Sequence, residues 1–316
     1  MIELVFGPAD LLQVRFAISP AEEVLGAIRT VAEPARHAYH LPWLRRLRDT
    51  SLDGLAELTT LITPLRGYAP DFLSPPPTSP LGDLDEQLSR LLVTPLEVIE
   101  AELTESLGEG LPDSLADPAA ARDLLARQMA TAWERLLAPS WSQMRDLLQA
   151  DVLARGRQLA ETGTRAVFDG LHPRVRWSDG SLRILGSRSS ERLALSGDGL
   201  LLVPSVFAWP GVMVMMRPPW QAALIFPARG VAALWQPPSP EPTLIKAFGR
   251  TRGTLLLDLV EPATTAALAR KHGMAPSTVS AHLTALRDAG LLTARRDGRS
   301  TYYELSPIGY ALMHGR

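Results

Sequence analysis

One segment constrains the fold more than any other: Ala275 to Leu292, APSTVSAHLTALRDAGLL, near the end of the 316-residue chain. Its apolar residues Val279, Leu283 and Leu286 stand at i, i+4 and i+7, so they share one face of a helix. The opposite face has small or short polar side chains, whereas an ordinary solvated helix face is rich in Lys and Glu. Small side chains allow the helix backbone to approach a large, shaped partner closely.

The residues before this helix extend it into a motif. Thr264 to His272 has the pattern of a short helix that is capped by Thr264 and followed by Gly273. Two helices joined by a short turn that contains Gly form a helix-turn-helix. Pro276 suits the first turn of the second helix, and Gly290 is expected to end it.

A basic hairpin is expected after the second helix. Leu291–Ala294 and Ser300–Leu305 alternate like strands, and Asp297-Gly298 between them is a strong hairpin signal. Three arginines surround this turn: Arg295, Arg296 and Arg299. An arginine-rich hairpin of this kind is suited to contact DNA phosphates.

This stretch resembles the winged helix-turn-helix of the ArsR/SmtB family of bacterial transcription regulators, over about Pro242 to Met313. The resemblance rests on Phe248–Arg252, Leu255–Leu259, Leu268-Ala269, Ser277–Leu283, Leu286–Leu291 and Arg295–Tyr303. It implies a homodimeric repressor that binds double-stranded DNA. The long leading region makes the whole chain similar to the extended actinobacterial members, which implies an architecture but no ligand. The alternative is a winged helix used only for protein contact or structure.

The candidate DNA-binding residues are Ser277, Thr278, Ser280, Ala281, His282, Thr284, Arg295, Arg296 and Arg299. The short hydroxyl side chains can bond phosphates or base edges, and Ala281 can touch a thymine methyl group. His282 matches a His of the family's recognition helix and lies at the edge of the apolar face, where a phosphate contact and a structural hydrogen bond are both open. The arginines are expected to reach the DNA backbone or the adjacent minor groove. Ser280, Thr284 and the three arginines are expected to be exposed.

Charge and cysteine content narrow the function further. The net charge of −2 hides an asymmetry, since residues 241–316 contain ten Lys/Arg and six Asp/Glu. The basic part of the chain is therefore the part expected to meet phosphates. The absence of Cys excludes disulfides and thiolate metal sites, so metal sensing through Cys, which the resemblance implies for many members, is closed to this chain.

The expected fold class is α+β in four regions. Residues 1–165 are expected to be mostly helical, 166–235 to form a small antiparallel sheet region packed on them, 236–242 to be a Pro-rich linker, and 243–316 to be the winged helix-turn-helix. Near the start, Ile2–Phe6 and Gln13–Ile18 are expected as strands around a Gly7-Pro8 turn, and Ser19 as the N-cap of a helix. The run Ser74–Pro80 is expected to be a stiff, exposed connector.

Several other features have alternative interpretations. His37 and His40 have a spacing that can bind a metal, but no acidic residue completes the ligand set, so buried hydrogen-bonding histidines are favoured. Asp169 and His172 are expected to fix a helix-to-strand turn. The Trp-rich segment 209–235 either lines an apolar ligand pocket or, as we expect, packs between the sheet and the helices. Leu136, Trp141 and Leu148 are expected to pack the helical bundle.

The sequence therefore predicts a sequence-specific DNA-binding regulator, a homodimeric repressor whose first 240 or so residues dimerise and sense an unknown small-molecule effector. The alternative is an enzyme or a protein-interaction module in residues 1–235 that the winged helix targets. No phosphate loop, HExxH or nucleophile elbow is present, so no catalysis, no cofactor and no metal are expected. The start lacks the pattern of a signal peptide and Leu200–Met216 is too short to cross a bilayer, so no membrane partner and a cytoplasmic location are expected.

Overall fold

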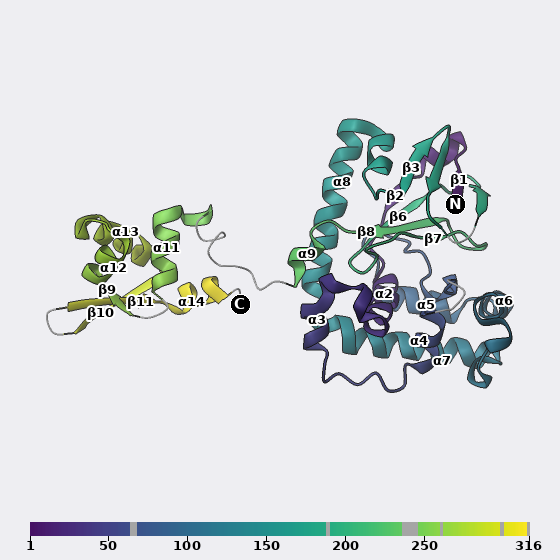
Figure 1. Cartoon of the computed structure of the whole chain (residues 1–316), viewed down its shortest axis with the longest axis horizontal. Coiled ribbons are helices and arrows are strands. Elements are labelled where there is room, and N and C mark those ends of the chain that lie inside the picture. The colour runs from purple at the N-terminus through teal and green to yellow at the C-terminus, as the bar shows by residue number, and fades with distance from the viewer. Residues whose placement is uncertain (64–67, 188–189, 236–245, 260–261, 298–299, 315–316) are drawn as a thin grey trace. The chain divides into compact units, whose positions relative to one another are not determined.

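The computed structural model of the chain describes residues 1–63, 68–187, 190–235, 246–259, 262–297 and 300–314. The chain divides into two compact units, Met1–Trp235 and Gln236–Arg316, each with a hydrophobic core of its own (Figure 1). The expected linker, residues 236–242, lies outside the described residues. No described helix is both long and apolar enough to cross a membrane.

Helices dominate the first unit. They are α1 (Pro8–Leu12), α2 (Pro20–Ala32), α3 (Leu41–Arg46), α4 (Ala56–Ile62), α5 (Leu84–Leu92), α6 (Leu96–Leu107), α7 (Pro118–Ala132), α8 (Trp141–Asp169) and α9 (Val231–Leu234). Short 3-10 turns are η1 (Pro34–Arg36), η2 (Ala38–His40), η3 (Asp71–Leu73), η4 (Gly108–Gly110), η5 (Asp113–Leu115) and η7 (Ala138–Ser140), and η6 (Trp133–Leu137) is a π-helical turn. Figure 1 shows α2, α4, α5, α6 and α7 gathered at one end of the unit, and α8 running beside the strands.

The start of α2 follows the sequence signal. Ser19 accepts a hydrogen bond from the Glu22 backbone N–H at 3.2 Å, and Pro20 occupies the first turn, so the predicted cap is confirmed. Helix α2 is buried along most of its length and joins the main core, which also contains Trp43, Phe207 and Trp235. Phe207 and Trp235 thus confirm that part of the 209–235 neighbourhood packs against the helices.

The strands form two four-stranded sheets. The first has the order β3-β4-β1-β5, from Val175–Ser178, Ser181–Ile184, Ile2–Val5 and Glu191–Ala194. The second has the order β2-β6-β8-β7, from Arg15–Phe16, Leu201–Ser205, Ala223–Pro227 and Met213–Met215. The α+β class is confirmed, but the sheets are mixed, because β1–β5, β2–β6 and β6–β8 pair in parallel. The expected antiparallel arrangement is wrong here because strands from the N-terminus insert between strands that are distant in sequence.

Two local predictions are wrong, and side-chain hydrogen bonds explain both. Pro8–Leu12 is helical and only Arg15–Phe16 pairs as a strand, because Asp10 accepts hydrogen bonds from the N–H groups of Gly7, Gly197 and Gly199. In the Ser74–Pro80 run, residues 74–77 are buried rather than exposed. The proline carbonyls there accept hydrogen bonds from the side chains of Arg15, Gln87 and Arg90.

The histidines and the turn after α8 behave as expected. His40 is buried, and its Nδ1 accepts a hydrogen bond from Trp235 Nε1 at 2.9 Å. His172 Nδ1 accepts from the Arg174 N–H, and Asp169 accepts from the Trp177 N–H, so both residues fix the turn between α8 and β3. Leu136 and Leu148 are fully buried in the main core, whereas Trp141 is only half-buried beside it.

The second unit is built from four labelled helices and one three-stranded sheet among its described residues. The elements are α11 (Arg250–Asp258), β9 (Ala263–Thr264), α12 (Thr265–His272), α13 (Pro276–Asp288), β10 (Leu292–Asp297), β11 (Ser300–Leu305) and α14 (Pro307–His314). The sheet order is β10-β11-β9. Helices α11, α12 and α13 share a core with the base of the hairpin.

Candidate nucleic-acid interface

The turn between α12 and α13 has the geometry of a helix-turn-helix. Thr264 caps α12 by accepting a hydrogen bond from the Ala267 N–H at 3.3 Å. Gly273 ends α12 with φ 61°, a left-handed conformation that glycine adopts without steric cost. The Met274 N–H then donates to the Ala269 carbonyl at 2.9 Å, and Pro276 starts the next helix. Each of these features occurs where the sequence predicts it.

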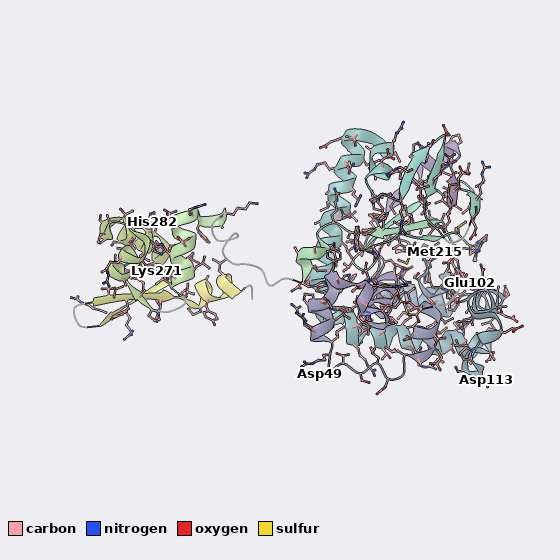
Figure 2. All side chains as sticks on the ribbon, viewed as in Figure 1. Asp49, Glu102, Asp113, Met215, Lys271 and His282 are labelled. Carbon is pink, nitrogen blue, oxygen red and sulfur yellow. The ribbon has the colours of Figure 1, made fainter. Side chains whose placement is uncertain are left out.

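Helix α13 has the two faces expected from its sequence. Val279, Leu283 and Leu286 are buried in the core of the unit. Ser277, Thr278 and Ala281 are exposed, and Ser280, His282 and Thr284 are half-buried. The expectation that Ser280 and Thr284 are exposed is therefore only partly met, because α13 packs against both α11 and α12 and these neighbours cover its edges. Figure 2 shows His282 on this unit.

An acidic residue that sequence reasoning missed connects α11 with α12. Asp258, at the end of α11, lies 2.8 Å from Lys271 Nζ and 2.6 Å from His272 Nε2 (Figure 2 labels Lys271). These two cations lie in the last turn of α12, where positive charge also interacts favourably with the helix dipole. Asp258 therefore fixes the first helix of the motif against its supporting helix. The signal was the acidic residue within the apolar run Leu255–Leu259.

The hairpin β10–β11 forms the wing. Its strands pair in antiparallel register, with Arg295 opposite Tyr302 and Arg296 opposite Thr301. Both arginines are exposed, and as neighbours on one strand they project from opposite faces of the hairpin. Arg299 lies outside the described residues. The wing thus offers positive charge on two sides.

The base of the wing is fixed to the rest of the unit in two ways. Strand β9 pairs with β11 through Tyr302 and Tyr303, and Tyr303 is buried in the core. The Ser306 hydroxyl donates to the Gly290 carbonyl at 2.6 Å, so the end of the hairpin is bonded to the end of α13. The recognition helix and the wing are therefore held together as one rigid surface.

The described residues include no group of three or more His, Asp or Glu side chains placed to hold a metal ion. His37 and His40 lie together in the first unit, with ring centroids 6.2 Å apart, but no third ligand joins them among the described residues. Burial lowers the pKa of His40 to about 4, so this imidazole is neutral at physiological pH.

The geometry can be compared with known proteins. Residues 254–294 match the family described as bacterial regulatory protein, arsR family, from within α11 to the start of β10. Residues 109–232 match a family of unknown function, DUF5937. Among solved structures, NolR from Sinorhizobium fredii is 34% identical to this chain, and the match covers 25% of this chain and 90% of NolR with a TM-score of 0.20. No curated protein matches the chain.

Proposed function

We infer that this chain, which belongs to the ArsR family of bacterial regulatory proteins and is a DNA-binding transcriptional regulator, acts as a homodimeric repressor in the cytoplasm. One observation carries this proposal: the exposed face of α13 is small and polar, and the exposed arginines of the wing belong to the same rigid unit. This combination suits insertion of a helix into the major groove while the wing contacts the backbone.

The proposed contacts follow the chemistry of each side chain. Ser277, Thr278, Ser280 and Thr284 hydrogen-bond phosphates or base edges, and Ala281 contacts a thymine methyl group. His282 contacts a phosphate from the edge of the helix. Arg295, Arg296 and Arg299 bind the DNA backbone or the neighbouring minor groove.

The C-terminal helix supports the proposal of a dimer. On α14, Ile308, Tyr310 and Leu312 are 65%, 56% and 45% exposed. Three large exposed apolar side chains on a short helix favour burial against a second copy of the same surface. A two-fold dimer presents two recognition helices to DNA, about one helical turn or roughly 34 Å apart, or a multiple of that distance.

We assign effector sensing, rather than catalysis, to the first unit. An effector regulates DNA binding when it binds the DNA-competent and DNA-incompetent dimers with different affinities. The competing hypothesis, an enzyme or protein-interaction module that the winged helix targets, is not favoured by a specific arrangement of catalytic side chains among the described residues.

Footprinting of sites recovered by genome-wide immunoprecipitation tests the proposal, together with the mass of the purified protein in solution. We expect a protected inverted repeat, a dimeric mass and increased transcription of the bound genes when the regulator is deleted. A protected site without dyad symmetry, or a monomer that binds DNA at full affinity, would contradict the homodimer. Decreased transcription on deletion would make the protein an activator.

A further inference from the structure

The first unit has a cavity of about 210 Å³ that none of the functional assignments above uses. It lies where the start of α2, the start of α5, the end of α7, the π-helical turn η6 and the start of α8 meet. We name it the Trp133 cavity, after one of its aromatic residues. Its volume is smaller than that of sites for drug-sized molecules, so it suits a small ligand.

Two tryptophans form the aromatic part of the wall. Trp133 and Trp141 contact edge to face, with ring centroids 4.9 Å apart and planes inclined by 63°. Both are half-buried and both line the cavity, so part of each indole surface is available to a ligand. The irregular backbone between them, a π-helical turn followed by a 3-10 turn, brings these rings together. Such π-helical turns are frequent at functional sites.

Three carboxylates form the polar part of the wall. Asp83, Asp85 and Glu134 line the cavity, and none of its lining residues is basic. Asp83 Oδ1 accepts a hydrogen bond from the Glu86 N–H and caps α5, whereas Asp85 and Glu134 form no side-chain ion pair within the described part of the chain. The cavity therefore has a negative potential that no protein cation neutralises.

The rim that positions Asp83 is tightly built. The Gly82 N–H donates to the Ile18 carbonyl at 3.0 Å, and a Cβ at position 82 would lie only 2.3 Å from that oxygen. Only glycine fits this close approach of two backbone segments. The first carboxylate of the cavity is consequently held by backbone contacts as well as by its capping bond.

We propose that the Trp133 cavity binds a small organic cation, an aromatic or methylated ammonium compound. The indole faces attract a cation through the negative charge of their π systems, and they suit a weakly hydrated ammonium group better than a metal ion. The carboxylates supply the opposite charge at the mouth. Identification of this cation as the regulator's effector rests on the proposed function, whereas binding in the cavity does not.

Calorimetric titration of the full chain without DNA tests the binding directly. The probes are tetramethylammonium and benzyltrimethylammonium, with benzyl alcohol as the neutral and benzenesulfonate as the anionic comparison. We expect saturable binding of at least one cation, and affinity at least about tenfold weaker for the other two compounds. Failure of both cations to saturate, or equal binding of benzenesulfonate, would overturn the proposal.

Variants locate the site. Trp133→Leu and the double variant Asp85→Asn/Glu134→Gln should each weaken cation binding by about tenfold, whereas Trp133→Phe, which keeps an aromatic face, should lose less. The matched control Glu97→Gln/Asp113→Asn removes two exposed carboxylates that do not line the cavity and should bind normally. Unchanged binding in the cavity variants, with melting temperatures that show folded protein, would overturn the assignment.

A DNA-shift assay with and without the cation separates the two claims. A change in operator affinity supports the effector role, and its loss in Trp133→Leu confirms the route. Saturable binding without any change in operator affinity would remove the effector role and leave the cation site intact. Failure of the protein to bind DNA at all would overturn the proposed function without affecting the calorimetric result.

Discussion

The two units of the chain place their charged side chains in opposite ways. The winged helix has an apolar core, and among its described residues Ser306 is the polar side chain that is buried. The first unit buries Glu22, Glu23, Asp71, Glu102, Asp151 and Arg155. One unit keeps its charges outside, where they can meet a charged partner, and the other uses charges inside its fold.

The buried charges of the first unit have specific partners. Glu23 accepts from the Val206 N–H through both carboxylate oxygens, at 3.0 and 3.2 Å. Glu102 accepts from the Phe72 N–H at 2.8 Å and from Trp220 Nε1 at 2.6 Å. Arg155 pairs with Asp151 at 2.9 Å. These bonds connect segments that are distant in sequence, so they favour one arrangement of helices and sheets over others.

Burial also makes the first unit sensitive to pH. Desolvation raises the pKa of Glu23 to about 8 and, with the nearby Glu102 charge, raises the pKa of Asp71 to about 8. A carboxyl group with a raised pKa in the folded state stabilises the fold fully below its ordinary pKa. That contribution is lost as the pH rises through the folded value, here near 8. The comparison of the two units thus predicts different responses to mutation, salt and pH.

The largest expected effect separates the two cores. Leu283→Ala removes a fully buried side chain of the winged helix and should destabilise that unit by about 2–5 kcal/mol. In calorimetry of the full chain, only the transition of the winged helix should shift, and operator binding should weaken with it. Leu58→Ala, in the core of the first unit, is the matched control and should shift the other transition. Equal shifts of both transitions in either variant would show that the units unfold together.

The outward charges of the winged helix are tested by Arg295→Ala/Arg296→Ala. The loss of phosphate contacts should weaken specific and nonspecific DNA alike and reduce the salt slope of log K by about 0.9 for each contact. Binding titrations at several salt concentrations measure this slope. The control Arg45→Ala/Arg46→Ala removes two adjacent, exposed arginines from the first unit and should leave the slope unchanged. Normal operator binding by a folded wing variant would make the hairpin a protein-contact surface.

The inward charges of the first unit are tested by Glu23→Gln. Glutamine keeps an oxygen that accepts from the Val206 N–H but cannot ionise, so the variant avoids a cost on the order of a few kcal/mol at high pH. Its melting temperature should exceed that of the native protein at pH 9 and approach it at pH 5. The first unit of the native protein should lose stability between these values. The exposed Glu97→Gln should reproduce the native pH profile, and a pH-independent difference for Glu23→Gln would refute the raised pKa.

A smaller effect is expected within the recognition helix. Ser280→Ala or Thr284→Ala should weaken operator binding by about 1 kcal/mol, roughly fivefold, and random DNA much less, because one hydrogen bond to a base edge is lost. Competition assays with operator and random DNA give the ratio. Equal losses for both DNAs would assign these hydroxyl groups to phosphate contacts.

The smallest expected effect is that of a chelator. Because no described trio of ligands can hold a metal, EDTA should leave operator affinity unchanged. A DNA-shift assay before and after dialysis measures this. Loss of binding that zinc restores, with stoichiometric metal in the purified protein, would contradict the expectation.

Local sequence determined the helix-turn-helix of this protein. The cap at Thr264, the left-handed Gly273, the apolar stripe of α13 and the strand pairing around the wing depend on contacts between residues that are close in the chain. Such contacts follow from helical periodicity and turn chemistry, which are visible in a single sequence. The partial burial of Ser280 and Thr284 was not visible, because it depends on neighbouring helices.

Only the tertiary structure decided the arrangement of the first unit. The parallel pairing of β1 with β5, the burial of residues 74–77 and the Trp133 cavity each join segments that are far apart in the chain. Strand periodicity predicts that a strand exists but not which strand it pairs with, since any partner can satisfy its hydrogen bonds. Trp141 fits a core stripe by sequence, and it lines a cavity because a π-helical turn from another part of the motif brings Trp133 beside it. The choice among such arrangements depends on the packing and hydrogen bonding of the whole unit.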